Sequence, residues 1–199
     1  MTTLTPQKNT ALQLNIVLSL ILLATLTRIA MSPLFGHLVN FSPIDAIALL
    51  SGAYFSRYLT AVSITLLSVW VGDIFLNRLF LGHWELFYSG FYWQYGAYAL
   101  ITCLGFMLAK NVKPLRLLST CFLSSILFFA VSNFGVWMSG LLYPRTMDGL
   151  MMCYTAALPF FKNTVFSDLF FSIILFTSFK LIEFNFSLKN KALPINHTQ

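Results

Sequence analysis

Long apolar stretches alternate with short polar segments along almost the whole chain. A helix that crosses a membrane needs about 20 mostly apolar residues. None of the stretches shows the strict alternation over roughly ten residues that a strand of a membrane β-barrel requires. The pattern therefore predicts an all-α, polytopic membrane protein with about six transmembrane helices. The predicted helices cover residues 12–31, 44–56, 58–78, 91–109, 114–138 and 159–183.

The boundary between the second and third predicted helices is weakly marked. The second is short, and only Ser56–Tyr58 separates it from the third. These segments form either two helices or one broken helix. Four prolines stand at proposed helix ends, where a residue without a backbone N–H is tolerated: Pro33, Pro43, Pro114 and Pro159.

No internal repeat or linker divides the chain. We therefore expect residues 1–199 to form one transmembrane domain with short tails at about 1–11 and 184–199. The apolar stretch after the N-terminus lacks a small-residue cleavage site, so we interpret it as a retained helix and not as a signal peptide.

The composition agrees with this interpretation. Hydrophobic residues make up 58% of the chain and charged residues only 9%, whereas a soluble domain carries about 25% charged residues. The mean hydropathy is +0.78. The net charge of +6 does not indicate nucleic-acid binding, because the basic residues are scattered and gather near helix ends, as membrane topology requires.

The basic residues also predict an orientation. Six helices place both termini on the same side of the membrane, and cytoplasmic loops carry the excess of Lys and Arg. The side with the termini holds eight basic residues and the other side four, so both termini are expected in the cytoplasm. The eight are Lys8, Arg57, Lys110, Lys113, Arg116, Lys180, Lys189 and Lys191; the four are Arg28, Arg78, Arg145 and Lys162.

Polar side chains gather in the outer halves of the predicted helices. Asp73 and Asn77 are four residues apart, as are Asn133 and Trp137, so each pair lies on one helix face. Ionisable groups at the bilayer centre cost about 2.5–3.5 kcal/mol on insertion scales, and they face a bundle interior or a wet cavity. We therefore predict an outward-facing pocket for a small molecule. Its predicted binding residues are Arg28, Asp45, Asp73, Asn77, Gln94, Tyr98, Asn133, Trp137, Arg145, Tyr154, Asn163 and Asp168.

A structural alternative stands beside the pocket. Arg28 would then neutralise Asp45, Asp73 or Asp168, and the other polar groups would join helices together. The one-sided distribution favours the pocket, because such joints would be spread over both halves of the bundle. No catalytic motif is present, so we predict neither an enzyme nor a cofactor or metal site. An intramembrane enzyme would need a carboxylate pair such as Asp73 and Asp168.

Two outer segments add to the predicted pocket. Arg78–Gly96 is rich in aromatic rings, which are typical of the membrane interface; Tyr92, Trp93 and Tyr95 are equally suited to stacking on a ligand. Residues 147–158 are too few to span, and we expect a short helix there that acts as a lid. Thr146 is its predicted N-cap. Cys153 lies on this helix, either as a packing residue or as a ligand to a metal in the substrate.

Two blocks of the sequence carry a family resemblance: "NFSPIDAIALLSGAYF" (Asn40–Phe55) and "NFGVWMSGLLYPRTMDGLMMCYTAALPFFKNTVFSD" (Asn133–Asp168). They resemble a family of small, uncharacterised proteins of the bacterial inner membrane. The layout of that family is similar to the S components of energy-coupling-factor vitamin transporters. This resemblance implies uptake of a vitamin-like molecule, a transmembrane coupling protein and an ATPase module as partners.

One feature departs from that resemblance. S components dock on their coupling protein through closely spaced alanines of the first helix, whereas this chain offers only Ser19, Ala24 and Ala30 there. The sequence thus predicts a small-molecule binding and uptake protein of the bacterial inner membrane. The alternative is a structural or assembly partner in that membrane, without transport activity.

Overall fold

The computed structural model describes residues 10–34, 40–109 and 112–192. These residues form six α-helices and no strand, which confirms the all-α prediction. Three helical segments are long and apolar enough to cross a membrane: Tyr58–Leu81, Pro114–Ser139 and Met147–Phe184. The helices are α1 (Thr10–Leu34), α2 (Ile44–Tyr54), α3 (Tyr58–Leu81), α4 (Phe91–Phe106), α5 (Pro114–Ser139) and α6 (Met147–Ala192).

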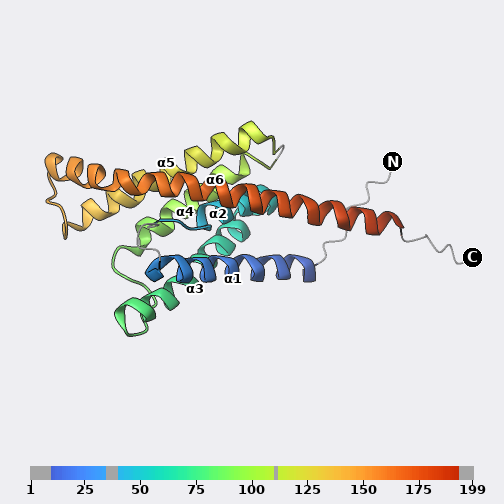
Figure 1. Ribbon diagram of the computed structural model, residues 1–199, viewed down its shortest axis with the longest axis horizontal. Helices are drawn as coiled ribbons and strands as arrows, with labels where there is room; N and C mark the ends of the chain where they lie inside the picture. Colours follow the sequence, from blue (N-terminus) through green and yellow to red (C-terminus); the bar gives the residue numbers. More distant parts are fainter. Residues whose placement is uncertain (1–9, 35–39, 110–111, 193–199) are drawn as a thin grey trace, which may run out of the picture.

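The helices alternate in direction through the bundle. α1, α3 and α5 run toward the left of Figure 1 and α2, α4 and α6 run back toward the right, with α2 beginning inside the bundle. α1 packs on α3, α4 lies between α3 and α5, and α5 packs along α6. The first turn of α1 and the last turn of α6 consequently lie at the same end of the bundle, on the right of Figure 1. The described helices therefore run up and down as the alternating sequence pattern predicts.

The short helix α2 occupies the centre. It contacts α3, α4, α5 and α6, and nine of its eleven residues, Ile44–Gly52, are buried. At 1.5 Å per residue it is only about 16 Å long, so it does not cross a bilayer. Phe55 (φ −93°, ψ 121°) and Arg57 (φ −103°, ψ 122°) are extended and separate α2 from α3. The two-helix alternative is therefore confirmed for this region.

A close backbone contact fixes α2 against α4. Gly52 and Gly105 face one another where the helices cross. A Cβ atom on Gly105 would collide with the Leu49 carbonyl oxygen and lie 3.0 Å from the Gly52 Cα. A Cβ atom on Gly52 would collide with the Thr102 carbonyl oxygen. Small residues allow this kind of approach in membrane bundles.

The predicted lid is wrong. Residues 147–158 are the first turns of α6, a continuous helix of 46 residues that passes through Pro159. The Thr146 hydroxyl accepts a hydrogen bond from the Gly149 N–H (3.2 Å), so the predicted N-cap is confirmed. The helix survives because proline removes one hydrogen bond, whereas contacts with α5 continue on both sides of it. Tyr154 donates to the Ala130 carbonyl (2.6 Å) before the proline.

The predicted tails are partly helical. α1 begins at Thr10 and α6 continues to Ala192, about 69 Å from its first residue. The remaining parts of the tails, residues 1–9 and 193–199, lie outside the described residues, as do His37, Lys110 and His197.

Candidate functional site

The predicted polar layer separates into two buried clusters in the structure. The arginine cluster consists of Arg28, Asp73 and Tyr95, from α1, α3 and α4. The aspartate pair consists of Asp45 and Asp168, from α2 and α6. The three carboxyl groups belong to residues that are only 1–4% exposed: 4% for Asp45, 3% for Asp73 and 1% for Asp168.

An ion pair is the centre of the arginine cluster. Nη2 of Arg28 lies 2.6 Å from Oδ1 of Asp73, and the Tyr95 hydroxyl donates to Oδ2 (2.9 Å). Nη1 of Arg28 donates to the Val69 carbonyl (3.1 Å). Gly72 leaves room for the guanidinium, because a Cβ atom there would lie 3.0 Å from Nη1. Of the three partners that the sequence allows for Arg28, the fold selects Asp73.

Two predicted residues beside this cluster bind the α3–α4 loop. Asn77 donates from Nδ2 to the Glu85 carbonyl (2.9 Å). Gln94 accepts from the Tyr88 hydroxyl (2.6 Å). Burial and the negative charge of Asp73 raise the pKa of Tyr88, so its hydroxyl keeps its proton and remains a donor. These contacts hold the loop over the arginine cluster.

The aspartate pair lies among hydroxyl groups of α5. The Ser125 hydroxyl donates to Oδ2 of Asp168 (2.5 Å), and the Ser124 hydroxyl lies 3.5 Å from the same oxygen. The carboxyl group of Asp45 lies within hydrogen-bonding range of the Asp168 carboxyl group. Asp168 is thus paired with Asp45 and not with Asp73, the partner that an intramembrane enzyme would need.

Tyr98 lies between the two clusters. It is 6% exposed, and its ring stacks on Phe128 with centroids 5.2 Å apart. Its hydroxyl interacts electrostatically with Asp45 on one side and with Arg28 and Asp73 on the other. The two clusters are therefore parts of one buried row of ionisable groups.

The predicted residues at the C-terminal end of α5 have structural partners. Trp137 donates from Nε1 to the carbonyls of Pro144 and Thr146 (3.1 Å each). Arg145 donates to the Ser139 carbonyl (3.3 Å), and Asn133 donates to the Phe129 carbonyl within its own helix (2.8 Å). These residues, with Tyr154, close the α5–α6 connection. None of these contacts involves Asp45 or Asp168.

The aromatic residues in the first turns of α4 have different contacts. Trp93 packs on Gly135 of α5, where a Cβ atom would collide with the indole ring, and lies 5.3 Å from the ring of Phe134. Tyr95 belongs to the arginine cluster, and Tyr92 is exposed. Of the three, only Tyr95 therefore touches the buried polar groups.

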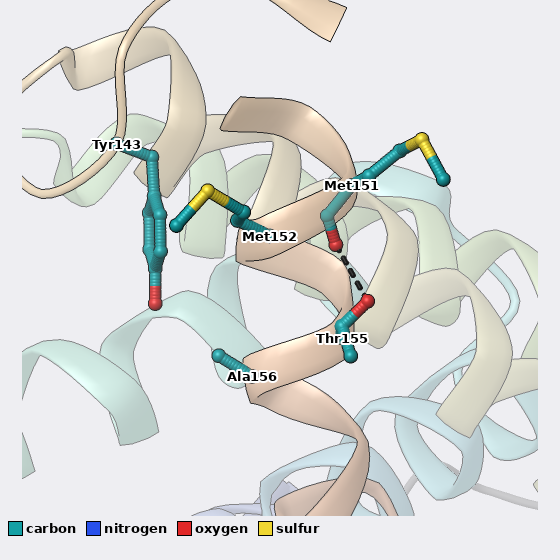
Figure 2. Close-up of a pocket in the computed structure, with 5 residues that line it drawn as sticks. All are labelled: Tyr143, Met151, Met152, Thr155 and Ala156. Carbon is teal, nitrogen blue, oxygen red and sulfur yellow. Dashed lines mark hydrogen bonds between the residues drawn. The ribbon is translucent and has the colours of Figure 1, made fainter. Parts of the chain in front are cut away.

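A shallow apolar hollow of about 440 Å³ lies beside the first turns of α6. Figure 2 shows Met151 and Met152 on the helix with Tyr143 facing Met152 across the hollow, and the Thr155 hydroxyl donating to the Met151 carbonyl (2.7 Å). Its walls carry no ionisable side chain except the Tyr143 phenol. It is therefore separate from the buried clusters in both position and chemistry.

Comparison with known proteins identifies the family. Residues 8–192 match the family described as "Family of unknown function (DUF6580)". The chain belongs to the DUF6580 family. No curated protein and no solved structure matches this DUF6580 member.

Metal-binding side chains are not grouped in the described part of this DUF6580 protein. Within residues 10–34, 40–109 and 112–192, no three His, Cys, Asp or Glu side chains are placed to hold a metal ion. Cys153 is buried, and its thiol donates to the Asn133 carbonyl (3.4 Å). Of the two roles that the sequence allows for Cys153, this contact supports packing. His83 is exposed, 4.0 Å from Glu85.

Sequence reasoning missed several polar residues around the aspartates of this DUF6580 member. Ser124 and Ser125 lie in the middle of an apolar span, and Ser172 follows Asp168 by four residues. That spacing places Ser172 on the Asp168 face of α6 and was a usable signal. Ser124 and Ser125 gave none, because serine is also common as a joint between membrane helices.

Proposed function

We propose that this protein binds a small polar solute within the membrane and carries it across. The observation that supports this proposal is the buried row of ionisable groups from five helices. Arg28, Asp73, Tyr98, Asp45 and Asp168 come from α1, α3, α4, α2 and α6 in turn. Ionisable groups inside membrane helices are costly and typically mark substrate and ion pathways.

The arginine cluster is the proposed point of solute binding. The Arg28 side chain is 16% exposed and that of Asp73 4%, so the guanidinium is the more accessible partner. A planar guanidinium with five donors suits a carboxylate or phosphate group. An anionic group of the solute would bind the accessible side of Arg28, with Asp73 remaining in its ion pair. Movement of helices would then carry the solute inward, with no covalent chemistry.

The proposed setting is the bacterial inner membrane with both termini in the cytoplasm. The solute would enter at the end where α4 and α6 begin, past the loop that Asn77 and Gln94 hold. A vitamin-like solute, a coupling protein and an ATPase module follow from the resemblance to S components. On α1, Ala24 is fully buried, whereas Ser19 and Ala30 are exposed. Only the latter two are available to a coupling protein.

The test is to identify what the purified protein carries. We expect mass spectrometry of protein extracted directly into nanodiscs to find an anionic small molecule at near-stoichiometric amounts. In the double variant Arg28→Gln, Asp73→Asn, the bound amount should fall about 10- to 100-fold, because a charge-assisted hydrogen bond contributes about 1.5–3 kcal/mol. Arg78→Gln, which removes an exposed guanidinium bound to the Gly82 carbonyl, is the matched control.

Two results would contradict the proposal. One is that no molecule is enriched over an unrelated membrane protein purified in the same way. The other is that the double variant retains the molecule as well as the wild type does, which would place binding away from Arg28.

A second candidate is an assembly partner without transport activity. The apolar hollow favours it, because Met151 and Met152 at its wall are 69% and 59% exposed. Methionine-rich surfaces adapt to partner proteins. Specific cross-linking from Met151 to one membrane protein, together with an empty buried row, would support this function in place of uptake.

A further inference from the structure

The aspartate pair has no basic partner among the described residues. The two ion pairs within that part of the chain are Arg28–Asp73 and His83–Glu85. The carboxyl groups of Asp45 and Asp168 interact with each other, and both residues are at most 4% exposed. A buried carboxylate without a counter-charge is strongly destabilising. The pair therefore needs a positive species, which is either a proton shared between the two carboxyl groups or a cation bound beside them.

Unsatisfied oxygen atoms mark the same place. Oδ1 of Asp168 is buried and has no donor among the N–H groups and hydroxyls of the described residues, and the buried hydroxyl of Ser172 meets only a thiol there. Ser172 lies beside the thiol of Cys121, which is itself within electrostatic range of Asp45 and Asp168. Buried polar atoms without partners are rare and require an explanation, such as a bound ion. Here these atoms belong to Asp168 itself and to Ser172, one turn further along the same helix.

We propose that Asp45 and Asp168, together with the hydroxyls of Ser124 and Ser125, bind a small monovalent cation, Na⁺ by preference. Carboxylate and hydroxyl oxygens are the ligands of hard cations. Ca²⁺ takes six to eight oxygen ligands and Mg²⁺ keeps several waters, so neither suits a buried site with two carboxyl groups and two hydroxyls. Each serine hydroxyl has one proton, and donating it leaves the oxygen lone pairs available to a cation.

The surroundings of the site are consistent with a single positive charge. The titratable groups that face it are Tyr98 from α4 and Cys121 from α5, both neutral when protonated. Arg28 and Asp73 also interact with Tyr98, and they form an ion pair with each other. With one proton kept between the two carboxyl groups, the pair carries a single negative charge, which one monovalent cation neutralises.

The position fits a coupling ion. Ser124 and Ser125 lie near the middle of α5, and α2 begins there as a short internal helix. Coupling ions of secondary transporters bind near the bilayer midplane where helices are interrupted. The existence of the cation site does not depend on uptake, whereas its coupling role rests on the function proposed above.

The test measures the thermal stability of the purified protein in detergent, without solute, at one fixed alkaline pH. Choline chloride is exchanged for NaCl or KCl at constant ionic strength, and unfolding is followed by tryptophan fluorescence. A ligand that binds only the folded state stabilises it by mass action. We expect saturating NaCl to raise the melting temperature by about 5–10 °C over choline, and KCl to raise it less.

Substitutions of the proposed ligands test whether Na⁺ stabilises the protein at this site. Asp168→Asn and Asp45→Asn should abolish the Na⁺-dependent shift, and Ser125→Ala should raise the half-saturating Na⁺ concentration about tenfold, as expected for a lost ligand. Asp148→Asn is the matched control, since it removes an exposed carboxylate in the first turn of the same helix. It should retain the full shift.

Several outcomes would overturn the cation site. They are a wild-type melting temperature that is equal in NaCl, KCl and choline, a response to Ca²⁺ or Mg²⁺ alone, or a Na⁺ shift that Asp168→Asn retains. If the Asp168 variant does not fold, the wild-type comparison and Ser125→Ala decide the result. A Na⁺ shift together with nanodisc preparations in which no co-purified molecule is found would contradict uptake and leave the cation site standing.

Discussion

Gly105→Ala is expected to lower the melting temperature of the detergent-solubilised protein by about 6–12 °C. The added methyl group would collide with the Leu49 carbonyl oxygen of α2, which is backbone and cannot rotate away. α2 and α4 would have to separate, and overpacking a close contact costs about 3 kcal/mol at its upper end. Because α2 carries Asp45, we also expect the Na⁺-dependent shift to weaken.

Gly96→Ala provides the matched control within α4. A Cβ atom at Gly96 meets no other atom within 4 Å, and alanine favours a helix over glycine by about 1 kcal/mol. This variant should be as stable as the wild type or slightly more so. Equal losses for the two alanine variants would show that α4 tolerates no change, and equal stability would contradict the close crossing of α2 and α4.

Arg28→Gln is expected to have the other large effect, a loss of about 3–5 kcal/mol in the free energy of unfolding. Removal of one partner from a buried ion pair leaves the other charge uncompensated. Asp73 would remain as a carboxylate that is 3% exposed, with only the Tyr95 hydroxyl bonded to it. The measurement is the midpoint of thermal unfolding, which should fall by about 10 °C or more.

The double variant separates this charge effect from a general packing effect. Arg28→Gln with Asp73→Asn leaves two neutral amide side chains that can bond to each other, so most of the lost stability should return. Exposed Arg78→Gln should change the midpoint by little, because surface substitutions lie within about 0.5 kcal/mol. If the double variant is as unstable as Arg28→Gln alone, the Arg28–Asp73 pair does not contribute through its charge.

The helix boundaries were predictable to within a few residues. The helix predicted at 58–78 is Tyr58–Leu81 in the structure, and the helix predicted at 114–138 is Pro114–Ser139. Backbone groups must be satisfied within a membrane helix, so the apolar stretches and the prolines that end them carry most of this information. The last helix is the exception at both ends: it was predicted at 159–183 and runs from Met147 to Ala192, because continuous contacts with α5 outweigh the single hydrogen bond that proline removes.

The charged residues of the candidate site could be predicted from the sequence, but the partner of each residue could not. All three buried aspartates and Arg28 were selected from the sequence as residues of the polar layer. The sequence allowed three partners for Arg28, and it gave no sign of Ser124 or Ser125. Partner choice depends on the rotation of each helix about its axis, and side-chain spacing within one helix does not determine that rotation.

By itself, the sequence determined that this protein is a bundle of apolar helices with a small set of ionisable groups inside it. Hydropathy and proline positions are local properties, and they act over the length of one helix. Only the tertiary structure decided that α2 lies at the centre, since Gly52 and Gly105 must meet across two helices to bring it there. That placement buries Asp45 against Asp168, and it separates this pair from the ion pair of Arg28 and Asp73.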